Sequence, residues 1–136
     1  MMSFEEIEHT ADRAFRVTGH DMVALLENAA RAMQALDGDG AKTTAERVET
    51  REIAVEGVDG ESLLVNWLNE ILYLNQAHHL VCEQFHIDEL KDHRLLARVE
   101  TRECDRTYTR IKAVTFHNLK IRETSEGLEA EIVVDV

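Results

Sequence analysis

The chain has 136 residues, and its 27 Asp and Glu residues outnumber 15 Lys and Arg residues, which gives a formal net charge of -12 at pH 7. This length predicts one domain spanning residues 1–136, and the 44% hydrophobic fraction is typical of a folded chain rather than a disordered one. A strong negative charge repels nucleic-acid phosphates, so direct nucleic-acid binding is not expected. The charge either aids solubility or speeds encounter with a basic protein surface.

The start of the chain and its cysteines exclude further classes. Residues 1–6 lack the basic segment and apolar run of a secretory signal, and no apolar stretch is long enough to cross a bilayer. We therefore expect a cytoplasmic protein without a membrane partner. Cys82 and Cys104 are too few for a disulfide scaffold and are not spaced as zinc ligands, so both are interpreted as ordinary buried or half-buried thiols.

In chain order, the predicted elements begin with a strand over residues 14–18, where apolar and polar side chains alternate. A helix is predicted over residues 22–36 because apolar residues recur at three- and four-residue steps, with Asp21 placed to cap it. A strand over residues 51–55 and a second helix over residues 63–74, which contains Trp67, come next. Further strands are predicted at residues 85–88, 95–99, 111–115, 119–121 and 128–134.

The order of these elements indicates the fold class. Strands gather in the second half with short connections, such as the turn at residues 125–127, and several alternate as strands do when one face of a sheet is wet. This pattern favours a single α+β domain over a doubly wound parallel fold. We expect a mostly antiparallel or mixed sheet with two main amphipathic helices packed on one face.

Two acidic positions near the ends of the chain are candidate metal ligands. Asp12 lies in a polar cluster just before the first strand, and Asp135 is followed by Val136, whose α-carboxylate adds oxygen atoms. If the first and last strands are neighbours, these groups form an all-oxygen site that suits calcium, magnesium or manganese. The alternative is that Asp12 caps a turn and Asp135 is a solvated acid at a frayed terminus.

The histidines support an accessory role at most. No His-Glu-x-x-His pattern, phosphate-binding glycine loop or nucleophile elbow is present, so no enzyme class is indicated. His9 and His117 are candidates for orienting metal-binding carboxylates by hydrogen bonds without touching the metal, as imidazoles do around many metals. His117 alternatively belongs to an ordinary hairpin turn with Asn118.

Five blocks of sequence resemble the archease family. They are His-Thr-Ala-Asp at residues 9–12, Leu-Leu-Glu-Asn-Ala-Ala at 25–30, the block at 63–74 around Asn-Trp-Leu-Asn-Glu, Lys-Ala-Val-Thr-Phe-His-Asn-Leu at 112–119, and the ending Val-Asp-Val at 134–136. The blocks occur in family order and cover nearly the whole chain. Their combination is more specific than any one of them.

The resemblance implies an α+β domain that binds a divalent cation, calcium in the family, through Asp12, Asp135 and Val136. It also implies a partner, the GTP-dependent tRNA-splicing ligase, whose guanylylation and repeated turnover archeases promote. The protein is then an activator and not itself an enzyme. A chaperone or general interaction module that protects a client protein is the alternative, and a metal-dependent phosphoesterase is disfavoured because no general base or nucleophile is evident.

The chain departs from the family at Asn66, where many members carry an acidic residue. Helical spacing places Asn66, Asn69, Glu70 and Tyr73 near one another beside the apolar stripe. This group is either a solvated helix face or a polar edge that meets a partner.

Overall fold

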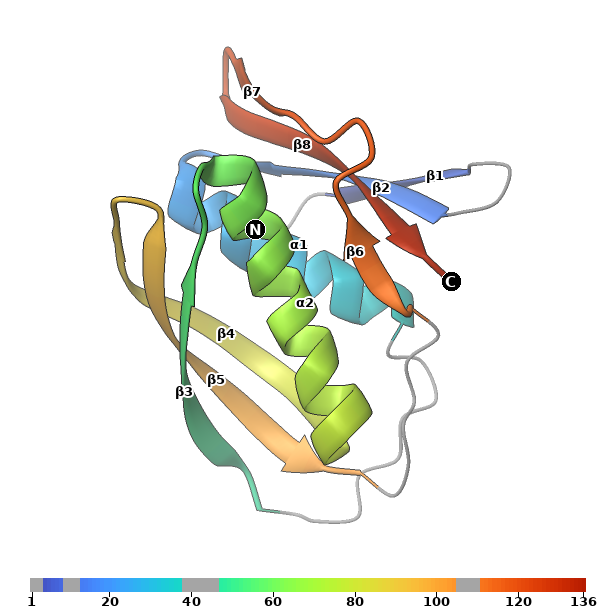
Figure 1. The fold of residues 1–136 in the computed structure, drawn as a ribbon, viewed down its shortest axis with the longest axis vertical. Coiled ribbons are helices and arrows are strands. Elements are labelled where there is room, and N and C mark those ends of the chain that lie inside the picture. Colours follow the sequence, from blue (N-terminus) through green and yellow to red (C-terminus); the bar gives the residue numbers. More distant parts are fainter. Residues whose placement is uncertain (1–3, 9–12, 38–46, 105–110) are drawn as a thin grey trace.

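The computed structural model describes residues 4–8, 13–37, 47–104 and 111–136, which form two helices and eight strands (Figure 1). The first half contains β1 (Phe4–Glu8), β2 (Arg13–Gly19), α1 (Met22–Asp37), β3 (Glu49–Glu56) and α2 (Gly60–His78). The second half contains β4 (Leu80–Lys91), β5 (Arg94–Glu103), β6 (Ala113–Thr115), β7 (Ile121–Thr124) and β8 (Gly127–Asp135).

The strands divide between two antiparallel sheets. One sheet has the order β1-β2-β8-β6, with β7 also paired to β8, and the other has the order β3-β5-β4. The predicted α+β class with two helices and antiparallel pairing is confirmed. The division into two sheets was not predicted: both helices contact strands of both sheets, so each sheet has a helix-covered face.

Local sequence signals fix where the helices start. Asp21 accepts a hydrogen bond from the Ala24 backbone N–H at 2.8 Å, as predicted for the cap of α1. At α2, Asp59 accepts from the Ser62 N–H at 2.7 Å, and the Asp59 N–H donates to the Ser62 hydroxyl at 3.1 Å, which completes a capping box. Hydrogen bonding of the Asp59 carboxyl to the backbone and side chain of Ser62 lowers its pKa, because it favours the charged form.

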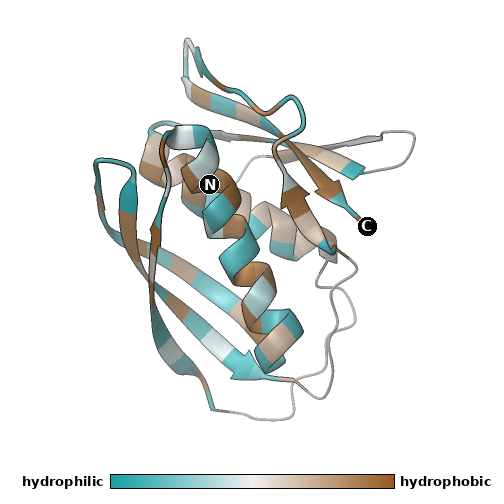
Figure 2. Ribbon diagram, viewed as in Figure 1, coloured by the Kyte–Doolittle hydropathy of each residue, from teal (hydrophilic) through white to brown (hydrophobic). Residues whose placement is uncertain are grey.

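The core centres on Trp67 of α2, which is fully buried as its apolar stripe predicted. The indole N–H of Trp67 donates to the Leu26 carbonyl of α1 at 2.9 Å, and its ring packs edge-to-face on Phe85 of β4 at a centroid distance of 6.2 Å. Trp67 therefore joins both helices to the three-stranded sheet. Figure 2 shows that hydrophobic residues also gather on β6 and on the final part of β8, beside the chain terminus.

The hairpin of β4 and β5 is longer than the predicted strands at residues 85–88 and 95–99. Its turn uses Asp92 and His93, which both adopt left-handed backbone conformations with φ of 52° and 58°. Two positive φ angles in a two-residue loop are typical of a type I′ turn, whose twist matches that of the strands. The sequence did not suggest this turn because neither residue is glycine.

Candidate functional site

The end of β8 lies between two other strands. Arg13 of β2 is paired with Val134, and Ala113 of β6 is paired with Asp135 on the other side (Figure 1). The first of these pairings gives the adjacency on which the candidate metal site depended, since the strand that follows Asp12 runs beside the terminal strand. His9 and Asp12 themselves lie outside the described residues.

The last two residues of the chain are exposed. Asp135 is exposed, Val136 is 41% exposed, and no described residue forms an ion pair or hydrogen bond with the Asp135 side chain. The Asp135 carbonyl is used differently, because it accepts a hydrogen bond from the Lys112 N–H at 2.7 Å. Within the described part of the chain, no group of three or more His, Cys, Asp or Glu residues is arranged to hold a metal ion. The donor set that is present, carboxylate oxygen, is the kind that hard divalent cations prefer.

The short strand β6 is secured to α2 by side-chain amides. Asn69 accepts a hydrogen bond from the Val114 N–H at 2.8 Å and donates to the Val114 carbonyl at 3.2 Å, so its amide acts as a neighbouring strand would. Gln76 donates to the Ile111 carbonyl at 3.1 Å. These contacts hold β6 against α2, and β6 in turn flanks Asp135. Helical spacing gave no sign of this role for Asn69, because its partner lies far away in sequence.

The other residues of the predicted polar edge on α2 differ in their surroundings. Asn66 is exposed and donates to the Glu56 carbonyl of β3 at 2.8 Å. Tyr73 is 51% exposed, and its ring lies edge-to-face with His78 at 5.4 Å. Tyr73 is thus a large, partly apolar side chain of α2 that is left exposed to solvent.

His117 lies in the turn after β6. Its ring Nε2 is 3.3 Å from the Asn118 amide nitrogen, and Asn118 has a φ of 52°, which Asn tolerates well in turns. Thr115, the last residue of β6, pairs with Val133, so His117 lies beyond Thr115, on the side away from the Ala113–Asp135 pair. An orienting role for His117 at a metal site stays a prediction.

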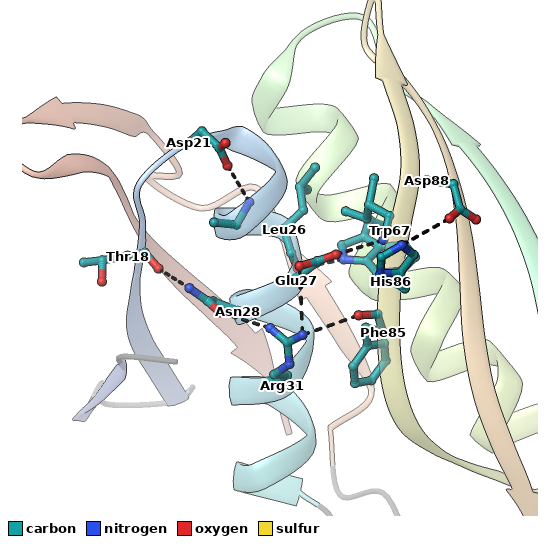
Figure 3. A network of polar contacts seen from close by, with 12 residues as sticks. Thr18, Asp21, Leu26, Glu27, Asn28, Arg31, Trp67, Phe85, His86 and Asp88 are labelled. Atoms are coloured by element: carbon teal, nitrogen blue, oxygen red, sulfur yellow. Dashed lines mark hydrogen bonds and ion pairs between the residues drawn. The ribbon is translucent and has the colours of Figure 1, made fainter. Parts of the chain in front are cut away.

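A second polar region surrounds the start of α1 (Figure 3). Asn28 is buried, donates to the Thr18 carbonyl at 2.8 Å and accepts from Arg31 at 3.2 Å. The Glu27 carboxylate accepts from the Ile87 N–H at 2.9 Å, beside an irregularity in the pairing of β4. These bonds tie α1 to β2 and β4, which explains why the polar residues Glu27 and Asn28 follow the apolar residues at the start of α1.

Both cysteines are buried thiols, as predicted, and neither forms a disulfide. Burial raises the pKa of the Cys82 thiol to about 12, although the positive charge of Arg51 acts in the opposite direction. A thiol with so high a pKa is a poor nucleophile at neutral pH. Among the described residues, no helix has both the length and the apolar character needed to cross a membrane.

Comparison with known proteins places the chain among relatives that match its full length. Residues 4–136 match the model of the "Archease protein family (MTH1598/TM1083)". A protein archease from Methanopyrus kandleri is 39% identical over 142 residues, which cover 99% of this chain and 100% of that protein.

Two solved structures share the fold. The solution structure of Methanobacterium thermoautotrophicum protein 1598 is 29% identical, with a TM-score of 0.71 and coverage of 98% of each chain. A crystal structure from Thermotoga maritima, described as an archease and possible chaperone, is 25% identical, with a TM-score of 0.67 and coverage of 97% of this chain and 96% of that one. The family match and the full-length likeness agree with the blocks of sequence described above, and the chain belongs to the archease family.

Proposed function

We propose that this protein activates the GTP-dependent tRNA-splicing RNA ligase, promoting the guanylylation and multiple turnover of that enzyme in the cytoplasm. Family membership supports the proposal, because the sequence resemblance implies this role. One observation carries it: β8 ends between β2 and β6, so the carboxyl end of the chain lies beside the strand that follows Asp12. The two strands next to the proposed metal ligands are therefore neighbours in the sheet.

The proposed metal site consists of Asp12, Asp135 and the terminal carboxylate of Val136, with His9 and His117 proposed to orient these groups. The oxygen donors suit calcium, with magnesium or manganese as alternatives. When bound, the cation would supply positive charge at an end of the chain that is otherwise acidic. The part played by this chain's own residues is to hold the carboxylates on a strand whose position is fixed by β2 and β6.

The net charge of -12 indicates how the protein finds its partner. An enzyme that joins RNA ends needs a basic surface to bind phosphates, and such a surface attracts an acidic protein. We propose that the chain docks beside this basic region and acts on the ligase rather than on RNA. Nucleotidyl transfer depends on positioning and electrostatics, so a docked protein can accelerate it without contributing a nucleophile.

A multiple-turnover RNA-joining assay tests this proposal. The ligase, GTP and broken tRNA would be mixed with substoichiometric protein whose C-terminus is native and untagged. We expect more joined product per ligase with the wild type, and loss of this gain with Asp12→Ala or Asp135→Ala. Glu100→Ala, which removes an exposed acid from β5, should behave as the wild type. Equal gain from Asp135→Ala and wild type would contradict the proposed metal site.

A chaperone function is the second candidate, because the Thermotoga maritima relative is described as a possible chaperone. In that case the acidic surface protects a basic client, and the effect falls as salt screens the charges. Suppression of client aggregation that is salt-sensitive, without any effect on RNA joining, would favour it over ligase activation.

A further inference from the structure

A groove lies between β3 and α2, on the side of α2 away from β6 and the chain terminus (Figure 1). It has a volume of about 450 Å³ and is lined by residues 51–54 of β3 and by Glu70, Tyr73, Leu74 and His78 of α2. The groove therefore combines the edge of a sheet with a helix that exposes an aromatic ring.

Arg51 is the unusual residue of this groove. Its Nε is buried and has no hydrogen-bond partner, and no described carboxylate pairs with its guanidinium. Other arginines of the same sheet are paired: Arg98 lies 2.8 Å from Asp88, and Arg102 lies 2.7 Å from Glu83. In a chain with a net charge of -12, an arginine that no described carboxylate pairs with needs a reason. A buried donor without a partner is costly, and a carboxylate in the groove would meet the guanidinium of Arg51, which lines it.

Among the described strands, β3 pairs only with β5, so its other backbone edge is left without a strand partner from that part of the chain. The Gly57 N–H donates to the His93 carbonyl at 2.9 Å, and residues along an antiparallel pair alternate between facing the partner strand and facing away. By this alternation Thr50, Glu52 and Ala54 direct their N–H and C=O groups away from β5. Glu56, two residues further along, should also face away from β5. Its carbonyl accepts a hydrogen bond from Asn66 of α2, in agreement with this assignment.

The side chains of β3 form two rows that differ in character. Thr50, Glu52 and Ala54 are exposed on the outer face of the sheet, whereas Arg51 and Ile53 point toward the helices. A strand added to this edge would place alternate side chains beside each row. Beside the inner row, a carboxylate would meet Arg51 and apolar groups would meet Ile53 and Leu74. Beside the outer row, a basic side chain would meet Glu52.

We propose that the edge of β3 binds an extended peptide segment of a partner protein as an added strand, with a carboxylate of that segment paired to Arg51 and lysines facing the outer row. Strand addition of this kind takes affinity from backbone hydrogen bonds and specificity from alternate side-chain positions. The proposal does not depend on ligase activation, because the groove and the chain terminus lie on different sides of α2.

A designed peptide can test the proposal directly. The probe is a short peptide with an acetylated N-terminus and an amidated C-terminus. Every second residue is lysine, for the outer row, and the residues between them are valine, glutamate and valine, for the inner row. The control peptide has glutamine in place of the glutamate. Binding would be followed by NMR, with hydrogen exchange measured at the amides of Thr50, Glu52 and Ala54. We expect these amides to exchange more slowly when the peptide is bound, and the glutamine peptide to bind on the order of tenfold more weakly. Equal binding of the two peptides, or binding that leaves all three amides unchanged, would overturn the proposal, as would no binding at all.

Two variants separate recognition from folding. Arg51→Met should lower the affinity for the glutamate peptide to that for the glutamine peptide. It should not lower the melting temperature, because the buried Nε that it removes has no hydrogen-bond partner in the free protein. Arg94→Met, on the neighbouring strand outside the groove, is the matched control and should bind as the wild type. If Arg51→Met instead binds normally and unfolds at a lower temperature, Arg51 has a structural role and the proposal is wrong.

Discussion

Asn69 offers a sharp test of how the chain terminus is supported. Its side-chain amide makes two hydrogen bonds to the backbone of Val114, at 2.8 and 3.2 Å, and Val114 is only 4% exposed. In Asn69→Ala, both backbone groups of Val114 lose this partner at a site with little access to water. Each buried group left without a partner costs about 1–2 kcal/mol, so we expect a total loss of about 2–4 kcal/mol in the free energy of unfolding.

The matched control is Asn66→Ala on the same helix. Asn66 is exposed and makes one hydrogen bond, to the Glu56 carbonyl, which water can replace. Its removal should cost less than about 1 kcal/mol. Urea unfolding gives both values, and the slope of the free energy with urea should stay unchanged if only native-state contacts are lost.

Hydrogen exchange locates the effect of Asn69→Ala. The amide of Val114 should exchange much faster in the variant, whereas the amides of β4 and β5, in the other sheet, should change only as the global stability does. If Asn69→Ala and Asn66→Ala are equally stable, or if Val114 keeps its protection in Asn69→Ala, the side-chain amide of Asn69 does not secure β6.

Three further predictions concern the core, a turn and a thiol. Trp67→Ala should lower the free energy of unfolding by about 3–5 kcal/mol, measured by urea unfolding, because a fully buried indole is lost, and comparable thermal melts of variant and wild type would contradict this. Gly127→Ala should cost about 2 kcal/mol or more in the same assay, since Gly127 has a φ of 138° and an added Cβ would lie 2.4 Å from the Gly19 carbonyl oxygen; an unchanged unfolding midpoint would refute it. Cys82 should resist alkylation at pH 8.5 in the folded protein and react once urea unfolds it, because its pKa is raised to about 12. Since the unfolded thiol ionises near its ordinary pKa of about 9.0 while the folded one stays protonated, the contribution of Cys82 to stability should fall as pH rises between these values, and rapid alkylation of native protein would contradict both expectations.

The helices could be predicted closely from sequence because their signals are local. The first was predicted over residues 22–36 and spans Met22–Asp37, and the second was predicted over residues 63–74 and spans Gly60–His78. The strands were harder to predict. Irregular pairing in β4 breaks the alternation of its side chains, and β1 was not predicted. The division into two sheets depends on pairings between distant residues, which no local pattern reveals.

The candidate site was only partly accessible from sequence. Asp12, Asp135 and Val136 could be named from the blocks that resemble the family, and the pairing of β2 with β8 supplies the neighbouring strands that the site needs. Asn69 could not be assigned to its role, because hydrogen bonding to Val114 requires knowledge of how α2 crosses β6. Arg51 was missed for a similar reason: an arginine in a strand becomes notable only when its Nε is found buried without a hydrogen-bond partner.

The most direct test of ligase activation is the rate at which the purified ligase becomes guanylylated by GTP, with and without this protein. We expect acceleration by the wild type with its native C-terminus, loss of acceleration in Asp12→Ala and Asp135→Ala, and normal acceleration in Glu100→Ala. An unchanged guanylylation rate with the cognate ligase would contradict this expectation and leave the chaperone function as the better explanation of an acidic archease.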